Sequence, residues 1–436
     1  MEEVQKHNTV DDLWVVVNGD VLDVTGYLKH HPGGETVVLS QAGLEATDAV
    51  FAMHPPEVVR EKMPKFCIGK VSEQNTHSLT EDYRHLRERI EQENLYQTNY
   101  TCYAWEGARI LLFLGFGLNG LINGESLWMH IGGAVALGLF WQQVAFIGHD
   151  LGHNGITHDR KIDSALGLIF GNLLTGVSLS WWKRSHNVHH VSTNWINYDP
   201  DIQHLPVFAI TSKLFKSIYS MYHERIFAFD AVAQFLVTYQ HWLFYPVMAL
   251  ARFNLYAQSL IHLATIKCVQ HRFLELMTEF MFAAWYAYVI SFVPTWQRKL
   301  LCVLISHAVV GLLHVQICLS HFSRKVYDEI PMKDSDANFF QCQVNTSMDV
   351  DCWPCLDWFH GGLQFQTVHH LFPRLPRHRL REFMHLVEGL AAKHSCHYHI
   401  TDFISANVEL IHQLKKTAKK AQGFNKGIWE GLHARG

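Results

Sequence analysis

The sequence predicts an N-terminal α+β domain followed by an all-α polytopic membrane domain with four transmembrane helices, interfacial helices and a cytosolic helical cap. Hydrophobic residues make up 48% of the 436 residues and charged residues only 17%, against roughly 25% charged in soluble domains. Acidic residues gather at the front of the chain, whereas long apolar runs follow residue 100. We therefore expect a soluble domain at 1–72, a linker helix at 73–100 and a membrane domain at 101–436.

The first domain opens with a predicted β-hairpin at 13–25. The stretch LWVVVNGDVLDVT places Asn18-Gly19 between two apolar runs, which is the strongest short signal for a tight hairpin turn. HHPGGETVV follows, and its Pro-Gly-Gly turn aims the side chain of His31. His54 comes later, just before a Pro-Pro stop.

Two imidazoles on opposite sides of an apolar crevice suit a six-coordinate haem, which carries electrons and leaves no open position for oxygen. The alternative is a turn with an unrelated surface histidine. The chain has 31 histidines, many more than a fold alone requires, and this favours ligation of haem and metal. We predict that His31 and His54 are axial haem ligands.

Apolar runs in the membrane domain predict four spans, each close to the roughly 20 residues that cross a bilayer. Two further apolar stretches contain Gly, Asp or His, and we expect them to lie in the membrane interface. The spans are expected at 105–122, 127–147, 275–293 and 299–319, and the interfacial stretches at 163–180 and 229–250.

The span count places three histidine clusters on one side of the membrane. The first cluster follows the second span with His149 and His153, and the second follows it with His186, His189 and His190. The third cluster, Gln366, His369 and His370, follows the fourth span. An even number of crossings precedes each cluster, so all share the side of the N-terminus, which we expect in the cytosol because no signal peptide precedes it.

The i, i+3 and i+4 spacing within the clusters puts the side chains of each on one helix face. Seven histidines exceed the coordination of one metal ion. A pair of irons can use them, since imidazole suits iron. Zinc has no redox chemistry and would leave a fused electron carrier unexplained.

Two other motifs carry no predicted chemistry. GFGLNG at 115–120 matches a dinucleotide fingerprint but lies inside an apolar span, where close helix packing is the better interpretation. Cys352-Trp-Pro-Cys355 has redox spacing without a surrounding βαβ pattern, and we interpret it as a structural loop. Nothing in the sequence predicts a nucleic-acid partner.

Taken together, these motifs resemble known families. His31-Pro-Gly-Gly with His54 and the lead-in KHN…DLWVVVNGDVLDVT resembles the cytochrome b5 domain. HDLGH, HNVHH and QTVHH behind it, with WWKRSHNVHH, NYDPDIQHLP, YQHWLFYP and DWFHGGLQFQTVHHLFPRLPR, resemble the front-end desaturases over nearly the whole chain. These stretches are most like plant-type sphingolipid delta-8 desaturases. The resemblance implies a cytochrome b5 domain fused to a membrane desaturase domain.

The resemblance also implies residue roles. It places a di-iron site on the histidines of the three clusters and on Gln366, with one further histidine from the loop after the fourth span. His321 is the first candidate for that histidine and His314 the second, while His158 is expected at the surface. Trp181, Trp182 and Phe365 are candidates for the mouth of the substrate channel. The sequence departs from the family at Val368, where an acidic residue is usual, and at Cys355, where an aromatic residue is usual.

The implied function is O₂-dependent front-end desaturation of a lipid chain, either a sphingolipid long-chain base at delta-8 or an acyl chain at delta-6, delta-5 or delta-8. The implied cofactors are haem b and two iron ions, with O₂ as co-substrate. NADH-cytochrome b5 reductase is the expected electron donor, and the endoplasmic reticulum membrane the expected location. A lipid hydroxylase with the same plan and a non-catalytic membrane haem carrier stay open as alternatives.

Overall fold

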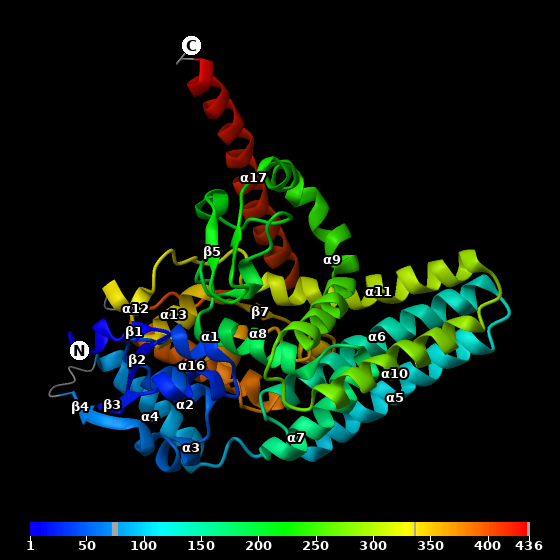
Figure 1. Cartoon of the computed structure of the whole chain (residues 1–436). Coiled ribbons are helices and arrows are strands. Elements are labelled where there is room, and N and C mark those ends of the chain that lie inside the picture. The colour runs from blue at the N-terminus through cyan, green and yellow to red at the C-terminus, as the bar shows by residue number, and fades with distance from the viewer. Residues whose placement is uncertain (72–76, 335–336, 434–436) are drawn as a thin grey trace.

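The computed structural model describes residues 1–71, 77–334 and 337–433 of the chain. Within them, a compact mixed domain at the N-terminus contacts one end of a bundle of long helices, and a helical cap lies over the same end (Figure 1). The predicted boundary between residues 72 and 73 lies outside the described residues.

The N-terminal domain is built on an antiparallel sheet with strand order β1-β2-β3-β4. Asn18 and Gly19 have φ angles of 51° and 80°, so the predicted hairpin between β2 and β3 is confirmed. Leu13 of β2 and Leu28 before the His31 turn are buried in the domain core. The strands are Asn8–Thr9, Asp12–Val17, Asp20–Asp23 and Cys67–Lys70, and the helices are α1 at Glu35–Leu39, α2 at Thr47–Met53 and α3 at Pro56–Glu61, with 3-10 turns at Val4–Lys6, Thr25–His30 and Met63–Phe66.

Helix α4, Ser78–Gln92, joins this domain to the rest of the molecule. Arg84 Nε and Arg87 Nη1 lie 2.8 and 3.3 Å from Asp48 of α2, and the side chains of Asp48 and Arg87 are each only 6% exposed. On the other side, the hydroxyl of Tyr83 donates a 2.9 Å hydrogen bond to the carbonyl of Leu371. Since a buried ion pair is costly to break, α4 fixes the N-terminal domain in place.

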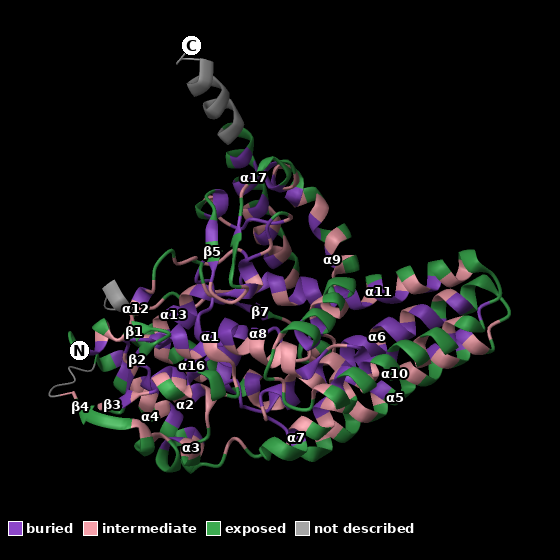
Figure 2. Ribbon diagram, viewed as in Figure 1, coloured by how far each residue is buried: buried purple, intermediate pink, exposed green. Residues whose placement is uncertain are grey.

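Four long helices run side by side away from the other elements (Figure 1). Of these, α6, α10 and α11 are long and apolar enough to cross a membrane, while α5 carries Glu106 and Arg109 near its start and is not among the three. Their outer surfaces expose large apolar residues such as Phe116 and Phe280, and Figure 2 shows exposed stretches along these helices. Such a surface fits contact with lipid. The helices are α5 at Tyr100–Ile122, α6 at Leu127–Gly152, α10 at Arg272–Ser291 and α11 at Trp296–Leu319.

The two stretches expected in the interface have different bounds from those predicted. The run at 163–180 is not one helix: α7 (Arg160–Gly167) passes into a π-helical turn (Leu168–Leu173), and α8 (Leu179–Val191) begins after Gly176, whose φ is 71°. The run at 229–250 belongs to a longer helix, α9, at Ala231–Thr265. It continues past residue 250, and the charged Arg252 beyond the apolar run is buried, with its guanidinium 5.2 Å from the ring of Trp141.

The cap covers the end of the bundle where the histidine clusters lie. Its helices are α12 at Pro331–Asp334, α13 at Phe339–Thr346, α14 at Asp357–His360, α15 at Gln366–Leu371, α16 at Leu380–Lys393 and α17 at Phe403–His433. Short strands pair as β5 (Ile218–Ser220) with β6 (Arg225–Phe227) and as β7 (Asp349–Asp351) with β8 (Ile400–Asp402), and 3-10 turns lie at Pro200–Ile202, Ser212–Phe215, Pro354–Leu356 and Arg377–Arg379. All nine cysteines are free.

Close packing of α5 on α6 depends on the glycines of the GFGLNG stretch. A Cβ atom added at Gly120 would lie 2.7 Å from Gly133 Cα, so the two backbones are in direct contact and no side chain fits between them. Gly115 lies on the same helix, but a Cβ atom added there would meet nothing within 4 Å. The predicted role of this stretch in helix packing is confirmed.

We expect Gly120→Ala to destabilise the protein by about 1–3 kcal/mol, because the added methyl group forces the two backbones apart. Thermal unfolding in detergent, followed by circular dichroism, measures the loss. Gly115→Ala is the matched control and should unfold at or above the wild-type temperature, since alanine is the better helix former. Equal stability of the two variants would contradict this account of the α5–α6 contact.

Candidate functional site

His31 and His54 face each other across a crevice in the N-terminal domain. Their ring centroids are 5.9 Å apart. Nδ1 of His31 lies 3.2 Å from the carbonyl of Gly34, and Nδ1 of His54 lies 2.9 Å from the carbonyl of Val50. Each carbonyl fixes a ring with the proton on Nδ1, which leaves both Nε2 atoms free to bind a metal between the rings.

Burial favours the neutral form of both rings. It lowers the pKa of His31 to about 4, with a further contribution from His54, and it lowers the pKa of His54. A neutral imidazole is the form that ligates iron. The pair therefore fits the axial positions of a haem by orientation, spacing and protonation.

The three histidine clusters meet at one place below the cap. Eight histidines form two adjoining groups, and within each group one ligand atom per residue lies within 4.8 Å of the others. The five-histidine group is His149, His153, His186, His190 and His369, and the three-histidine group is His189, His321 and His370. The second cluster links the groups, because His186 and His190 of α8 belong to one and His189 to the other.

Hydrogen bonds orient the rings of the three-histidine group. Nδ1 of His189 is 3.1 Å from both carboxylate oxygens of the fully buried Asp199. Nδ1 of His321 is 3.0 Å from the carbonyl of Thr346, and Nδ1 of His370 is 3.0 Å from Gln343 Oε1. These partners turn Nε2 of each ring toward the shared space, the arrangement that outer residues impose on metal-binding histidines.

Burial and neighbouring charges set the pKa values of the histidines in both groups. Burial lowers the pKa of His186, His190, His369 and His370 well below the ordinary value, and neighbouring histidines add to the effect. Burial also lowers the pKa of His321, to about 3. For His189 the effect of burial is outweighed by Asp199 and Asp201, which raise its pKa to about 9.

The donor set fits a pair of metal ions. Nε2 of His153, His369 and His370 is buried and has no hydrogen-bond partner. Orphaned buried nitrogens are costly in a folded protein. A metal ion in each group would satisfy them, and imidazole nitrogen is a suitable ligand for iron.

Comparison with known proteins agrees with this arrangement. A family described as "Fatty acid desaturase" matches residues 126–402, and one described as "Cytochrome b5-like Heme/Steroid binding domain" matches residues 1–72. The chain belongs to the fatty acid desaturase family. It is thus a lipid-metabolising membrane oxidoreductase that uses haem in its cytochrome b5 domain and a histidine-ligated di-iron centre.

Several curated relatives match over most of the desaturase chain. Delta(8)-fatty-acid desaturase 2 of Arabidopsis thaliana is 37% identical over 441 residues, covering 100% of this chain and 97% of that protein. The acyl-lipid (9-3)-desaturase of Borago officinalis is 36% identical over 441 residues, covering 100% and 98%. The delta 8-(E)-sphingolipid desaturase of Emericella nidulans is 42% identical over 348 residues, covering 78% and 62%. Among solved structures, cytochrome b5 of Ostreococcus tauri virus 2 is 37% identical and covers 16% of this chain and 92% of that chain, with a TM-score of 0.16.

The residues singled out in the desaturase sequence occupy distinct places. His321 lies in the three-histidine group, and the side chain of Gln366 interacts with it. His314 is buried on α11 outside both groups, and neither of its ring nitrogens has a partner. Val368 is fully buried in an apolar cluster with Leu371, so it packs the third cluster against the cap.

Trp181, Trp182 and Phe365 differ in their surroundings. The ring of Trp182 is 4.3 Å from His186 and 5.3 Å from His153, and it fills the space above Gly152, where no Cβ atom would fit. Trp181 is half-buried beside it on α8. Phe365 is 3% exposed and packs in the interior, with the guanidinium of Arg381 5.0 Å from its ring.

The residues that orient the histidines were missed by reasoning from the sequence. Asp199 lies in NYDPD, which the family resemblance includes without a role for it, and Asp150 stands inside HDLGH itself. Asp150 is 3.3 Å from His149 Nδ1 and accepts hydrogen bonds from Tyr103 and Arg377. The carboxylates beside the metal groups thus come from NYDPD and HDLGH, and position 368 supplies none.

The cytochrome b5 domain rests directly on the helix that carries the second cluster. A Cβ added at Gly33 would lie 3.2 Å from Asn187 Nδ2, and one at Gly34 would lie 3.2 Å from Arg184 Cγ. Gly34 also has a φ of 94°, which favours glycine. The turn after His31 therefore touches α8 one residue away from His186.

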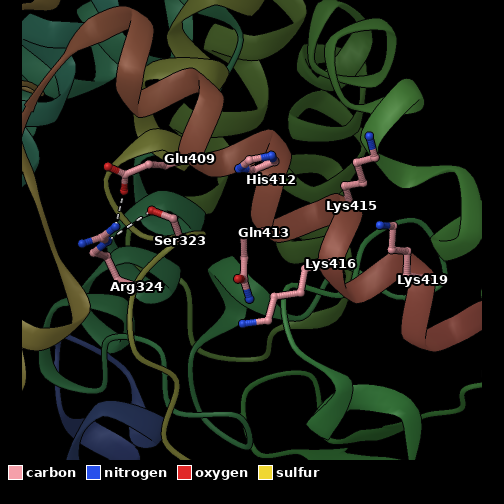
Figure 3. A pocket seen from close by; sticks show the side chains of 8 residues that line it. All are labelled: Ser323, Arg324, Glu409, His412, Gln413, Lys415, Lys416 and Lys419. Atoms are coloured by element: carbon pink, nitrogen blue, oxygen red, sulfur yellow. Dashed lines mark hydrogen bonds and ion pairs between the residues drawn. The ribbon is translucent and has the colours of Figure 1, made fainter.

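A separate groove of about 500 Å³ lies between α17 and the segment after α11, away from the histidine groups (Figure 3). Arg324 and Glu409 form an ion pair at one end, and Lys415, Lys416 and Lys419 line α17. No residue of the two metal groups lines it, so the groove plays no part in the candidate site.

We expect Asp199→Asn to lower the affinity of the three-histidine group for iron by about 10–100-fold, the usual effect of removing a residue that orients a ligand. Iron content per haem in the purified protein, measured by mass spectrometry, reports the loss. Asp351→Asn, at an exposed carboxylate on β7, is the control and should keep its iron. Full iron content in the Asp199 variant would show that the His189–Asp199 contact does not support metal binding.

Proposed function

We propose that this chain is a front-end desaturase that places a double bond in the long-chain base of a sphingolipid at the delta-8 position. The observation that carries the proposal is the pair of adjoining, largely buried histidine groups beside a bis-histidine crevice. Two relatives are named as delta-8 desaturases, and these names support the delta-8 position of the double bond.

In this proposal residues 1–72 form the haem domain, 73–100 the linker and 101–436 the desaturase domain. Each histidine group holds one iron ion. His31 and His54 bind the haem, and Gln366 lies beside the iron of the three-histidine group. The ligands are His149, His153, His186, His190 and His369 for one iron and His189, His321 and His370 for the other.

The two irons would supply O₂ activation strong enough to remove hydrogen from two adjacent CH₂ groups, which no acid or base can do because an unactivated CH₂ has no acidic proton. The protein's residues bind, orient and exclude water. Asp199 and Asp150 hold His189 and His149 in the ligating tautomer. Trp182 closes the apolar side of the five-histidine group. Val368 and Leu371 seal the cap side against water.

In this scheme a separate NADH-cytochrome b5 reductase would be the electron donor, and a haem held by His31 and His54 would supply one-electron transfer to the metal centre of the same chain. The contact of Gly33 and Gly34 with Asn187 and Arg184 of α8 supports this route, because it brings the turn after His31 to a residue next to His186 in the sequence. The ion pairs of α4 hold this contact in place.

We further propose a four-span topology in the endoplasmic reticulum membrane, with α5 as the fourth span beside α6, α10 and α11. The backbone contact at Gly120 supports it, since small residues at helix contacts are typical of membrane-spanning pairs. The haem domain and the histidine groups then face the cytosol, and Lys183, Arg184 and Arg374 near them follow the positive-inside rule.

Expression in yeast should give a new double bond in sphingolipid long-chain bases, detected by mass spectrometry of the extracted lipids. His31→Ala and His189→Ala should each abolish it, because one removes a haem ligand and the other an iron ligand. His30→Ala and His385→Ala are matched controls at exposed histidines, and should retain activity. Hydroxylated chains alone would indicate a hydroxylase, and haem iron without further iron would indicate an electron carrier.

Co-expression of His31→Ala with His189→Ala should restore no activity, because each haem domain is fixed against the metal groups of its own chain. Each variant has the centre that the other lacks, so electron transfer between chains would restore product. Product at more than about a tenth of the wild-type level would contradict delivery within one chain. Equal amounts of both variants in the membrane, measured by immunoblot, complete the comparison.

A further inference from the structure

A buried polar cluster lies where α8, α9 and α10 meet. Glu275 and Glu279 on α10 are 3% and 7% exposed, His262 of α9 is 6% exposed, and Ser178 before α8 is fully buried. Ser180 in the first turn of α8 is half-buried and gives the cluster an open side. Ionisable residues inside a membrane domain are rare and mark functional positions.

Contacts within the cluster converge on one carboxylate oxygen. Ser178 Oγ donates to Glu275 Oε2 at 2.5 Å and Ser180 Oγ at 3.0 Å. Asn172 Nδ2 lies 3.4 Å from the same oxygen, and Ser180 Oγ lies 3.2 Å from His262 Nε2. Among the residues that the structure describes, none donates to Glu275 Oε1, so half of this carboxylate is available to a ligand.

Glu279 is the second carboxylate and has no partner. Its Oε1 is buried without a hydrogen bond, and it is close enough to Glu275 for the two to repel each other. The i, i+4 spacing puts both on one face of α10. Neither forms a salt bridge within the described part of the chain. The charge of Lys183 on α8 acts on Glu275, but without an ion-pair contact. A pair of buried carboxylates that lacks a direct ionic partner is costly, and a bound group with hydrogen-bond donors lowers that cost.

We propose that this cluster binds the polar end of the lipid substrate and thereby determines which carbons reach the metal groups. This inference rests on the proposed desaturase function and names the substrate chemistry of the same site. Because the cluster presents acceptors, the ligand carries donors: hydroxyl groups together with an ammonium or an amide N–H, as in a free or an N-acylated long-chain base. The carboxylates repel a phosphate or carboxylate head.

The distance along α8 from Ser180 to His186 sets the position in the lipid chain at which the double bond forms. Ser180 and His186 are six residues apart on one helix, which is an axial rise of about 9 Å. An extended chain advances roughly 1.2 Å per bond. A chain whose polar end contacts Ser180 and Glu275 therefore reaches His186 no earlier than about its seventh bond, which matches a double bond well beyond the polar end. The ring of Trp182 is 4.3 Å from that of His186, at the metal end of this path.

The test compares wild type with Glu275→Gln, Glu279→Gln and Ser180→Ala, each with Glu125→Gln as the control at an exposed carboxylate. Purified protein is assayed on a free long-chain base and on its N-acylated form, and double-bond positions are mapped by mass spectrometry. We expect each cluster variant to raise KM at least about tenfold, the loss expected for a hydrogen bond to a charged group. We also expect double bonds at several neighbouring positions, because the chain end is no longer held. Haem and iron contents should stay at wild-type levels.

The two substrates separate the sources of the donor groups. A larger loss for the free base than for the N-acylated form on Glu279→Gln identifies an ammonium as the partner of that carboxylate, and equal losses identify the shared hydroxyl groups. Unchanged KM and a single unchanged double-bond position in all three variants would overturn the proposal. If wild type forms no double bond in any lipid, the desaturase function itself fails, which is a separate outcome. The half-buried Ser180→Ala variant, which removes only a hydroxyl, keeps the test valid if a glutamate variant does not fold.

Discussion

The structure depends on holding eight imidazoles, six of them buried, so that their ring nitrogens are aimed at two shared points. A buried ring without an Nδ1 partner can adopt either tautomer and can rotate, so fixed acceptors beside the rings preserve the arrangement. Asp199, Thr346 and Gln343 supply acceptors from three different segments of the chain. The cap places those segments over the ends of the long helices. The apolar cluster around Val368 and Phe372 then excludes water from the same place.

The two imidazoles of the haem domain also need fixed hydrogen-bond acceptors. Backbone carbonyls of Gly34 and Val50 orient its two imidazoles, and α4 orients the whole domain. The buried contacts of Asp48 with Arg84 and Arg87 join the domain to α4, while Tyr83 joins α4 to the segment after the third cluster. Electron carrier and metal centre are therefore parts of one rigid arrangement.

Much of this could be predicted from short stretches of sequence. The Asn18-Gly19 turn, the His31 turn and the spacing of the clusters are local patterns, and the three clusters meet in the structure. The orienting residues could not be predicted in this way, because Gln343 and Thr346 reach their histidines across many intervening residues. The predicted end of this apolar stretch at residue 250 was wrong, because the charged Arg252 is buried against Trp141 on another helix. The cluster around Glu275 was missed because it assembles from three helices, none of which shows a motif.

Helix α8 carries Ser180 of the polar cluster as well as the second histidine cluster, and this limits how such an enzyme can acquire a new product. One residue inserted between Ser180 and His186 lengthens the path by about 1.5 Å but also rotates everything beyond it by about 100°. The rotation would turn His186, His189 and His190 away from their partners. Evolution of chain-position selectivity must therefore leave the length of α8 untouched and proceed by moving acceptor groups onto neighbouring helices.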